Sequence, residues 1–261
     1  MNRTLQSSDP KEKLKEVRLT DHLEDLRNRL IKSVIAAIFG FLVCYAFSQD
    51  LFKLMTAPLL EVMPLESHLI YTSLPEAFFT HVKVAFVAGL FLVSPYISYQ
   101  IWRFITPGLY ESEQKHIVLI AVLSAVFFVS GALFGYFIVF PFGFEFFMGF
   151  ADDAIKPMPG LREYFSFSVK LLLAFGVIFE LPLFIFFLAR LGLVTADYLR
   201  KKRKYAILLA FIVGAILTPP DGVTQILMAV PLIILYEISI YVALAFGGKK
   251  KLSTLDIQVG A

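Results

Sequence analysis

A single carboxylate, Glu180, lies in the middle of an apolar run that extends from Lys170 to Arg190. About 20 apolar residues cross the hydrocarbon core of a bilayer, so this run predicts a membrane-spanning helix. A charged side chain at that depth costs at least ~2.5 kcal/mol and therefore faces protein, water or a partner instead of lipid. Pro182 lacks an N–H donor and should kink the helix. Glu180 is thus either a protonated carboxyl bonded to a neighbouring helix or a polar contact point for a partner inside the membrane.

A second carboxylate, Glu237, lies in the last apolar run, and together with Glu180 it could form the proton relay of a transporter. Against this relay, no basic residue lies near the centre of any apolar run, since Lys32 and Lys170 lie near the ends, where lysine reaches the interface. The sequence has no nucleotide-binding loop, no helical zinc-binding histidine pair and no serine-nucleophile motif, so we expect neither an enzyme nor a cofactor. The single cysteine, Cys44, excludes a disulfide framework and a cysteine-based metal site.

The composition is that of an all-α polytopic membrane protein. Hydrophobic residues make up 58% of the 261 residues and charged residues only 17%, whereas charged residues are about a quarter of an ordinary globular domain. Six apolar segments are expected to span the membrane, and they are residues 31–47, 82–105, 117–140, 170–190, 205–217 and 223–246. The fifth, at about 13 residues, is too short to cross a full-thickness bilayer without thinning it or oligomerising.

Three further segments are expected to position these spans. Residues 19–30 carry leucines at helical spacing among charges, which predicts an amphipathic helix lying on the membrane surface and leading into the first span. The long connection 48–80 is expected to pack on the membrane face, because a free connection of this length is uncommon in a compact protein. The aromatic-rich residues 141–165 are expected to re-enter the second side of the membrane.

Basic residues set the predicted orientation. The chain has seven Lys and Arg up to Arg29, six in residues 190–204 and three in the C-terminal tail, and the positive-inside rule therefore places both termini in the cytoplasm. The first 29 residues also lack the apolar segment of a signal peptide. We expect a flexible N-terminus at 1–18, a six-span domain at 19–247 and a cytoplasmic tail at 248–261.

Acidic groups then stand on a cytoplasmic face where basic residues normally dominate. Paired carboxylates accept a guanidinium in bidentate geometry, which indicates a receptor for an arginine-bearing peptide. The alternative is that Glu24 and Asp25 simply pair with Arg27 and Arg29 or complement the helix N-terminus. The acidic positions are Glu24, Asp25, Glu111 and Glu113.

Several ordered motifs add up to a family resemblance. They are HLEDLRNRL at 22–30, APL at 57–59, YQIWRFITPGLYESE at 99–113, GYFIVFPFGFEFF at 135–147, LAFGVIFELP at 173–182, DYLRKKRKY at 197–205 and TPPDGVTQ at 218–225. From about residue 19 to residue 247 the chain resembles the TatC family, the multispanning core subunit of the twin-arginine protein translocase.

The resemblance implies a receptor for the signal peptides of folded export proteins. Glu113 corresponds to the family's loop glutamate, and Glu111 lies in the same loop. In the family's H-L-x-E-L-R pattern the usual glutamate position is occupied here by Asp25, with Glu24 one residue before it, so which of the two contacts an arginine stays open. Arg27 matches the arginine of that pattern.

The resemblance also implies docking sites for partner subunits. Glu180 matches an intramembrane glutamate that lines a concave, cup-like face where the single-span subunits TatA and TatB dock. Thr218 and Gln225 match a polar region at the outer end of the last two spans, and we add Glu237 to these docking positions. The expected setting is an oligomeric complex in the bacterial cytoplasmic membrane, with no nucleic-acid partner. The alternatives are a proton-coupled secondary transporter that uses Glu180 and Glu237, and a passive scaffold.

Overall fold

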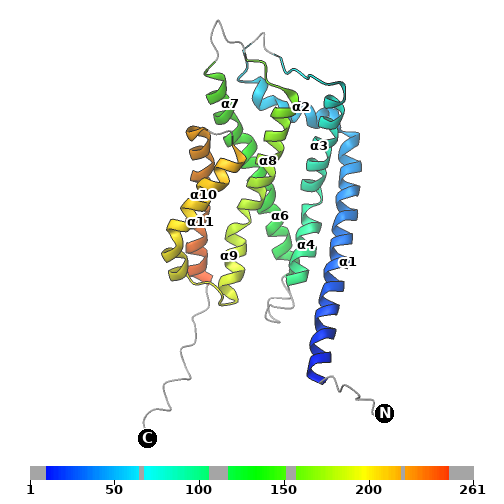
Figure 1. The fold of residues 1–261 in the computed structure, drawn as a ribbon, viewed down its shortest axis with the longest axis vertical. Coiled ribbons are helices and arrows are strands. Elements are labelled where there is room, and N and C mark those ends of the chain that lie inside the picture. Colours follow the sequence, from blue (N-terminus) through cyan, green and yellow to red (C-terminus); the bar gives the residue numbers. More distant parts are fainter. Residues whose placement is uncertain (1–9, 65–67, 106–116, 151–156, 219–220, 247–261) are drawn as a thin grey trace, which may run out of the picture.

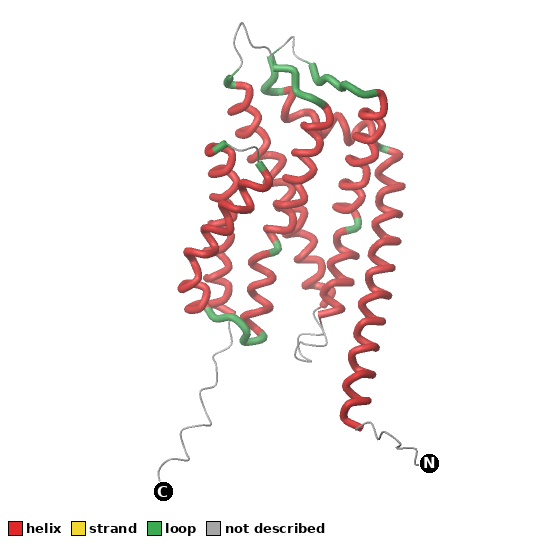
Figure 2. Tube along the Cα trace, viewed as in Figure 1, coloured by secondary structure: helices red, strands yellow, loops and turns green. Residues whose placement is uncertain are grey.

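The protein is all-helical in the computed structural model, which describes residues 10–64, 68–105, 117–150, 157–218 and 221–246 (Figure 1). Helices lie roughly side by side, and the described loops lie at the two ends of the bundle (Figure 2). The elements are α1 (Pro10–Ala46), α2 (Ser48–Leu60), α3 (Leu74–Leu92), α4 (Ser94–Ile105), α6 (Ile117–Phe134), the π-helix η2 (Gly135–Val139), α7 (Phe140–Met148), α8 (Leu161–Phe179), α9 (Leu181–Arg190), α10 (Ala196–Leu217) and α11 (Gly222–Phe246).

The bundle runs from α1 at one edge to the α10–α11 pair at the other (Figure 1). α1 packs on α3 and α4, α6 packs on α8, and α11 packs on both α10 and α9. The beginning of α1 and the end of α11 lie at the same end of the bundle (Figure 1). The α10–α11 hairpin does not reach as far toward the opposite end as α7 and α8 do.

Within the described residues, five helical stretches are long and apolar enough to cross a membrane, and they are Leu23–Ala46, Leu74–Leu92, Ile117–Met148, Leu161–Arg190 and Gly222–Phe246. The predicted fifth span, residues 205–217, lies inside α10, whose first half carries the basic run, and this run lowers the hydropathy of the helix. Large apolar side chains such as Phe39, Phe137 and Ile216 are exposed on the outside of the bundle. Such a surface fits a lipid solvent, and the protein is a polytopic membrane protein.

α1 corrects two expectations about the N-terminal region. It begins at Pro10, so residues 10–18 of the segment expected to be flexible are helical. It also continues without a break to Ala46, so residues 19–30 are collinear with the first span and the expectation of a helix lying flat on the membrane surface is wrong. The physical reason is local, because no Gly or Pro stands between Leu19 and Phe39 to end the helix.

Two expected connections contain helix. The 48–80 connection includes α2 and the first turns of α3, which begins after Ser73 with Pro75 in its first turn. The 141–165 segment does not re-enter: α7 continues the preceding helix through η2, and α8 begins at Leu161. Pro141 is tolerated because it stands in the first turn of α7. The predicted kink at Pro182 is confirmed by the break between α8 and α9 at Glu180.

Among the described residues, Glu76 is the one buried carboxylate, and it joins the beginnings of α3 and α8. Its Oε2 accepts the backbone N–H groups of Thr72 and Ser73 at 3.1 and 3.4 Å, which caps α3. Its Oε1 accepts the N–H of Arg162 at 2.8 Å, in the first turn of α8. Beside it, an isolated parallel bridge pairs Ile70 with Gly160. Glu76 therefore ties the loop before α3 to the beginning of α8, at the end of the bundle opposite to the beginning of α1 (Figure 1).

The largest buried cluster of the described chain lies between α2, α7, η2 and α8, and it is rich in aromatic rings. Phe144 packs on Tyr164 and Phe140, with ring centroids 5.3 Å apart in both pairs. Phe165 and Phe175 are also fully buried. Since lipid supplies no hydrophobic driving force between helices, such packing and the interhelical hydrogen bonds hold the bundle together.

Candidate functional site

An apolar hollow of about 560 Å³ opens between α4, α6, α8 and α9, with one carboxylate and three serines in its wall. Its lining consists of Leu90, Ser94, Ile97, Ser98, Ile101, Trp102, Ile105, Ser124, Phe128, Leu173, Val177, Glu180 and Phe184. The break at Glu180 exposes this side chain to the hollow, because α8 ends and α9 begins at that residue. Close packing of α6 on α8 forms one wall, where a Cβ on Gly176 would meet the Phe128 ring at 2.7 Å.

Glu180 is bonded to a short chain of hydroxyls. The Ser124 hydroxyl donates to Glu180 Oε1 at 2.7 Å and lies 3.2 Å from the Ser98 hydroxyl. A serine hydroxyl has one proton, so when Ser124 donates to Glu180 it accepts from Ser98. The second carboxylate oxygen makes no hydrogen bond to any described residue. Glu180 is therefore held in place by Ser124 and keeps acceptor capacity for a donor that enters the hollow.

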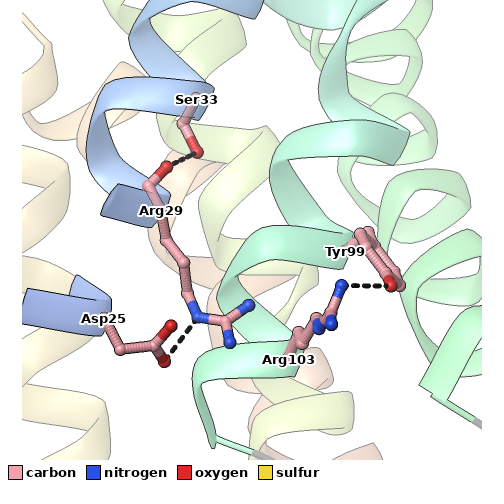
Figure 3. A network of polar contacts seen from close by, with 5 residues as sticks. All are labelled: Asp25, Arg29, Ser33, Tyr99 and Arg103. Carbon is pink, nitrogen blue, oxygen red and sulfur yellow. Dashed lines mark hydrogen bonds and ion pairs between the residues drawn. The ribbon is translucent and has the colours of Figure 1, made fainter. Parts of the chain in front are cut away.

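The acidic pair on α1 is divided between two environments. Asp25 faces α4 and accepts a 2.7 Å hydrogen bond from Nε of Arg29 one turn later, as Figure 3 shows. Glu24 and Arg27 are exposed. The expectation that an acidic residue pairs with an arginine of the same helix is confirmed for Asp25 and Arg29. Across from this pair, Arg103 of α4 donates to the Tyr99 hydroxyl at 3.1 Å (Figure 3).

Two further acidic candidates, Glu111 and Glu113, lie outside the described residues, in the segment between α4 and α6. The helix ends on either side are described, and Asp25 of α1 lies across from Arg103, in the last turn of α4 (Figure 3).

Polar groups hold the end of the α10–α11 hairpin at which the two helices are joined. The amide of Gln225 donates to the Phe211 carbonyl at 3.0 Å, and the hydroxyl of buried Thr218 donates to the Gly214 carbonyl at 3.0 Å. Gly214 allows the close approach, since a Cβ there would lie 3.1 Å from the backbone oxygen of Gln225. Asp221 caps α11 by accepting the Thr224 N–H at 2.7 Å. Thr218 and Gln225 therefore lie together.

Glu237 stands apart from these residues. It follows Gln225 by twelve positions on α11, which is about 18 Å along a helix. Its Oε2 accepts a 2.6 Å hydrogen bond from Arg203 of α10, in an ion pair between the two helices. Among the described residues, Glu180 and Glu237 bond to different partners, so the structure offers no support for a proton relay between them. The predicted docking residues form three separate places: the hollow, the hairpin end and this ion pair.

Comparison with known proteins decides the family. The family model described as Sec-independent protein translocase protein (TatC) matches residues 21–231. The chain belongs to the TatC family. The TatC of Desulforapulum autotrophicum is 52% identical over 231 residues, covering 88% of this chain and 86% of that protein. The TatC of Escherichia coli K12 is 40% identical over 231 residues, covering 88% and 90%.

A solved structure of a TatC agrees with the fold. A crystal structure of a twin-arginine translocase receptor, TatC, superposes with a TM-score of 0.78 at 41% identity and covers 86% of this chain and 98% of that one. Membership of the TatC family makes the chain a protein-translocase subunit, a transport protein and not an enzyme.

Sequence reasoning missed three side chains that shape these sites. Ser98 and Ser124 are ordinary serines in apolar helices, and only the packing of α4 and α6 on α9 brings them to Glu180. Arg203 belongs to a basic run in the sequence, but no local pattern pairs it with Glu237, which is 34 positions away. The signal available was general: a carboxylate within an apolar helix requires a polar partner.

Proposed function

We propose that this TatC-family chain is the signal-peptide receptor and assembly core of a twin-arginine translocase that exports folded proteins across the bacterial cytoplasmic membrane. The single observation that carries the proposal is the family match over residues 21–231. The proposed topology has six spans with both termini in the cytoplasm, and α10 is the short fifth span. The concave face is the hollow around Glu180.

Recognition is proposed to take place at the end of the bundle where α1 begins. The residues are Asp25, Glu24, Arg27, Glu111 and Glu113. Carboxylates at this end supply the local attraction for two guanidinium groups, which the neighbouring arginines oppose. The described geometry supports this role for Asp25, which lies on the side of α1 that faces α4 instead of facing away from the bundle (Figure 3).

Docking of the single-span partners TatA and TatB is proposed at two places, the hollow around Glu180 and the hairpin end with Thr218 and Gln225. The hollow supports this role because its apolar wall suits a transmembrane helix and its carboxylate has acceptor capacity left after bonding Ser124. Glu237 is reassigned by this proposal: its bond to Arg203 suits a brace between α10 and α11 better than a docking contact.

Substitution of Glu180 tests the docking role. Glu180→Gln should keep most partner association, because the amide carbonyl still accepts a hydrogen bond in the same shape, whereas Glu180→Ala should lose it. One intramembrane hydrogen bond contributes ~0.6–2 kcal/mol, so the alanine variant should bind about three- to thirtyfold more weakly. Co-purification of the tagged single-span partner measures the effect. Ser124→Ala is the matched variant and should give a smaller loss. Equal failure of the Gln and Ala variants would point instead to an obligatory proton carrier.

Site-specific thiol labelling tests the orientation. After replacement of the native Cys44 by serine, cysteines are placed at two exposed positions, Leu193 between α9 and α10 and Met158 before α8. An impermeant reagent added to intact cells should label Met158→Cys, and it should label Leu193→Cys only after permeabilisation. Labelling of Leu193→Cys in intact cells would reverse the orientation and remove the basis for the peptide site.

A further inference from the structure

We propose that Arg29 is an internal competitor for the signal peptide: its guanidinium occupies Asp25 in the peptide-free receptor and must be displaced before a peptide arginine can bind that carboxylate. The inference rests on the proposed function and adds to it a residue that sets affinity. Nothing in the peptide-recognition motif by itself assigns this role to Arg29.

The geometry of the pair carries the first step. Arg29 Nε lies 2.7 Å from Asp25 Oδ2, one helical turn away, so the bond uses the same chemistry that a peptide arginine would use. The Arg29 side chain is only 17% exposed, while that of Asp25 is 41% exposed. The guanidinium thus lies between α1 and α4 (Figure 3), and the carboxylate is the more accessible partner.

The burial of Arg29 distinguishes the pair from an ordinary surface ion pair. Exposed ion pairs contribute little to stability, because ordering two mobile side chains costs entropy and water screens the charges. Arg29 is already fixed by its surroundings, and its position beside Asp25 costs little further ordering. Arg29 therefore occupies Asp25 in most receptor molecules. Only the remaining molecules, in which Asp25 is free, can bind a ligand arginine at this carboxylate.

Neighbouring charges act in the same direction. Arg103 of α4 lies across from the Asp25–Arg29 pair, with its guanidinium bonded to the Tyr99 hydroxyl of its own helix (Figure 3). A peptide that carries two arginines must therefore approach a carboxylate that is neutralised by Arg29 and flanked by another cation. Removal of Arg29 frees Asp25 and removes one like charge, and both effects raise peptide affinity.

The magnitude follows from the competent fraction. If Asp25 is free in roughly a tenth to a third of receptors, removal of the competitor raises the apparent affinity by about three- to tenfold. The freeing of Asp25 precedes contact with any ligand, so a twin-arginine and a twin-lysine peptide should gain by the same factor. A simple helix-stabilising role for the pair predicts the opposite sign, since loss of the pair would then weaken binding or leave it unchanged.

The experiment measures binding of a synthetic signal peptide with two adjacent arginines to the full-length protein in lipid nanodiscs. Arg29→Gln should bind about three- to tenfold more tightly than wild type. Arg29→Met keeps an apolar stem between α1 and α4 and should show the same gain if the glutamine variant folds poorly. Arg29→Lys retains a cation next to Asp25 and should stay near wild type. Arg103→Gln is the matched control, because it removes a neighbouring charge without touching Asp25, and it should change binding less than about twofold.

A double variant isolates the competition. In the Asp25→Asn background, Arg29→Gln should give no gain, because the site for which Arg29 competes is absent. Weaker or unchanged binding by both Arg29→Gln and Arg29→Met would overturn the inference, and so would a gain that persists without Asp25. Failure of the wild-type protein to prefer the twin-arginine peptide over a twin-lysine peptide would instead overturn the proposed function. The two failures are therefore distinguishable.

Discussion

Glu113→Ala is expected to weaken binding of a twin-arginine signal peptide by about ten- to a hundredfold. A hydrogen bond to a charged group contributes roughly 1.5–3 kcal/mol, and about 1.4 kcal/mol corresponds to one decade of affinity. The loss should be large because the arginines of this end of the protein oppose the peptide, so few carboxylates supply the attraction. Titration of a labelled peptide against the protein in nanodiscs measures the effect.

The controls for this prediction vary one charge at a time. Glu111→Ala removes a carboxylate of the same loop and should cost less. Asp25→Ala and Glu24→Ala decide which position of α1 meets the peptide, and the location of Asp25 on the side of α1 that faces α4 favours Asp25 (Figure 3). Added salt should weaken the wild-type complex through screening. Equal binding by wild type and Glu113→Ala, together with equal binding of a twin-lysine peptide, would show that this loop is not the receptor site.

Glu76→Ala is expected to lower the free energy of unfolding by about 2–4 kcal/mol, because it leaves three backbone N–H groups without their acceptor at two helix ends. Those groups belong to Thr72, Ser73 and Arg162. Glu76→Gln keeps one good acceptor and should lose less than half as much. Thermal or denaturant unfolding of the purified protein in detergent measures the change.

Glu163 provides the matched control for Glu76. It is an exposed acidic residue in the first turn of α8, next to the groups that Glu76 caps. Glu163→Ala should cost no more than about 0.5 kcal/mol, since only its interaction with the helix dipole is lost. Similar losses for Glu76→Ala and Glu163→Ala would mean that charge near the helix end matters and the specific hydrogen bonds do not.

The sequence was sufficient for features that depend on local chemistry. Apolar length predicted membrane helices, and the break at Glu180 followed from Pro182. The pairing of Asp25 with Arg29 was foreseen as an alternative because the residues lie one helical turn apart. The sequence did not predict α2, because this helix is short and contains a proline. Its stability comes from the packing of Leu59 and its neighbours in the buried cluster.

The contacts that could not be predicted join distant parts of the chain. Ser124 meets Glu180 across 56 positions, and Glu76 meets the N–H of Arg162 across 86. No periodicity encodes such pairs, since each depends on the crossing of helices that are individually apolar.

The straight course of α1 was also not predicted, because an amphipathic pattern describes which faces of a helix are polar and not where the helix bends.

The π-helix η2 determines in which direction the side chains of α7, the helix that follows it up to Met148, point. The N–H of Phe140 bonds to the carbonyl of Gly135, five residues earlier, so this turn holds one residue more than an α-helical turn. A helical wheel drawn from Ile117 to Met148 with one period therefore assigns wrong faces beyond Val139, by about 100°. Deletion of one residue in η2 would restore a regular α-helix and rotate Phe140 and Phe144 away from Tyr164. An insertion or deletion of one residue in this turn would therefore rotate the faces of α7, in addition to changing the length of the helix.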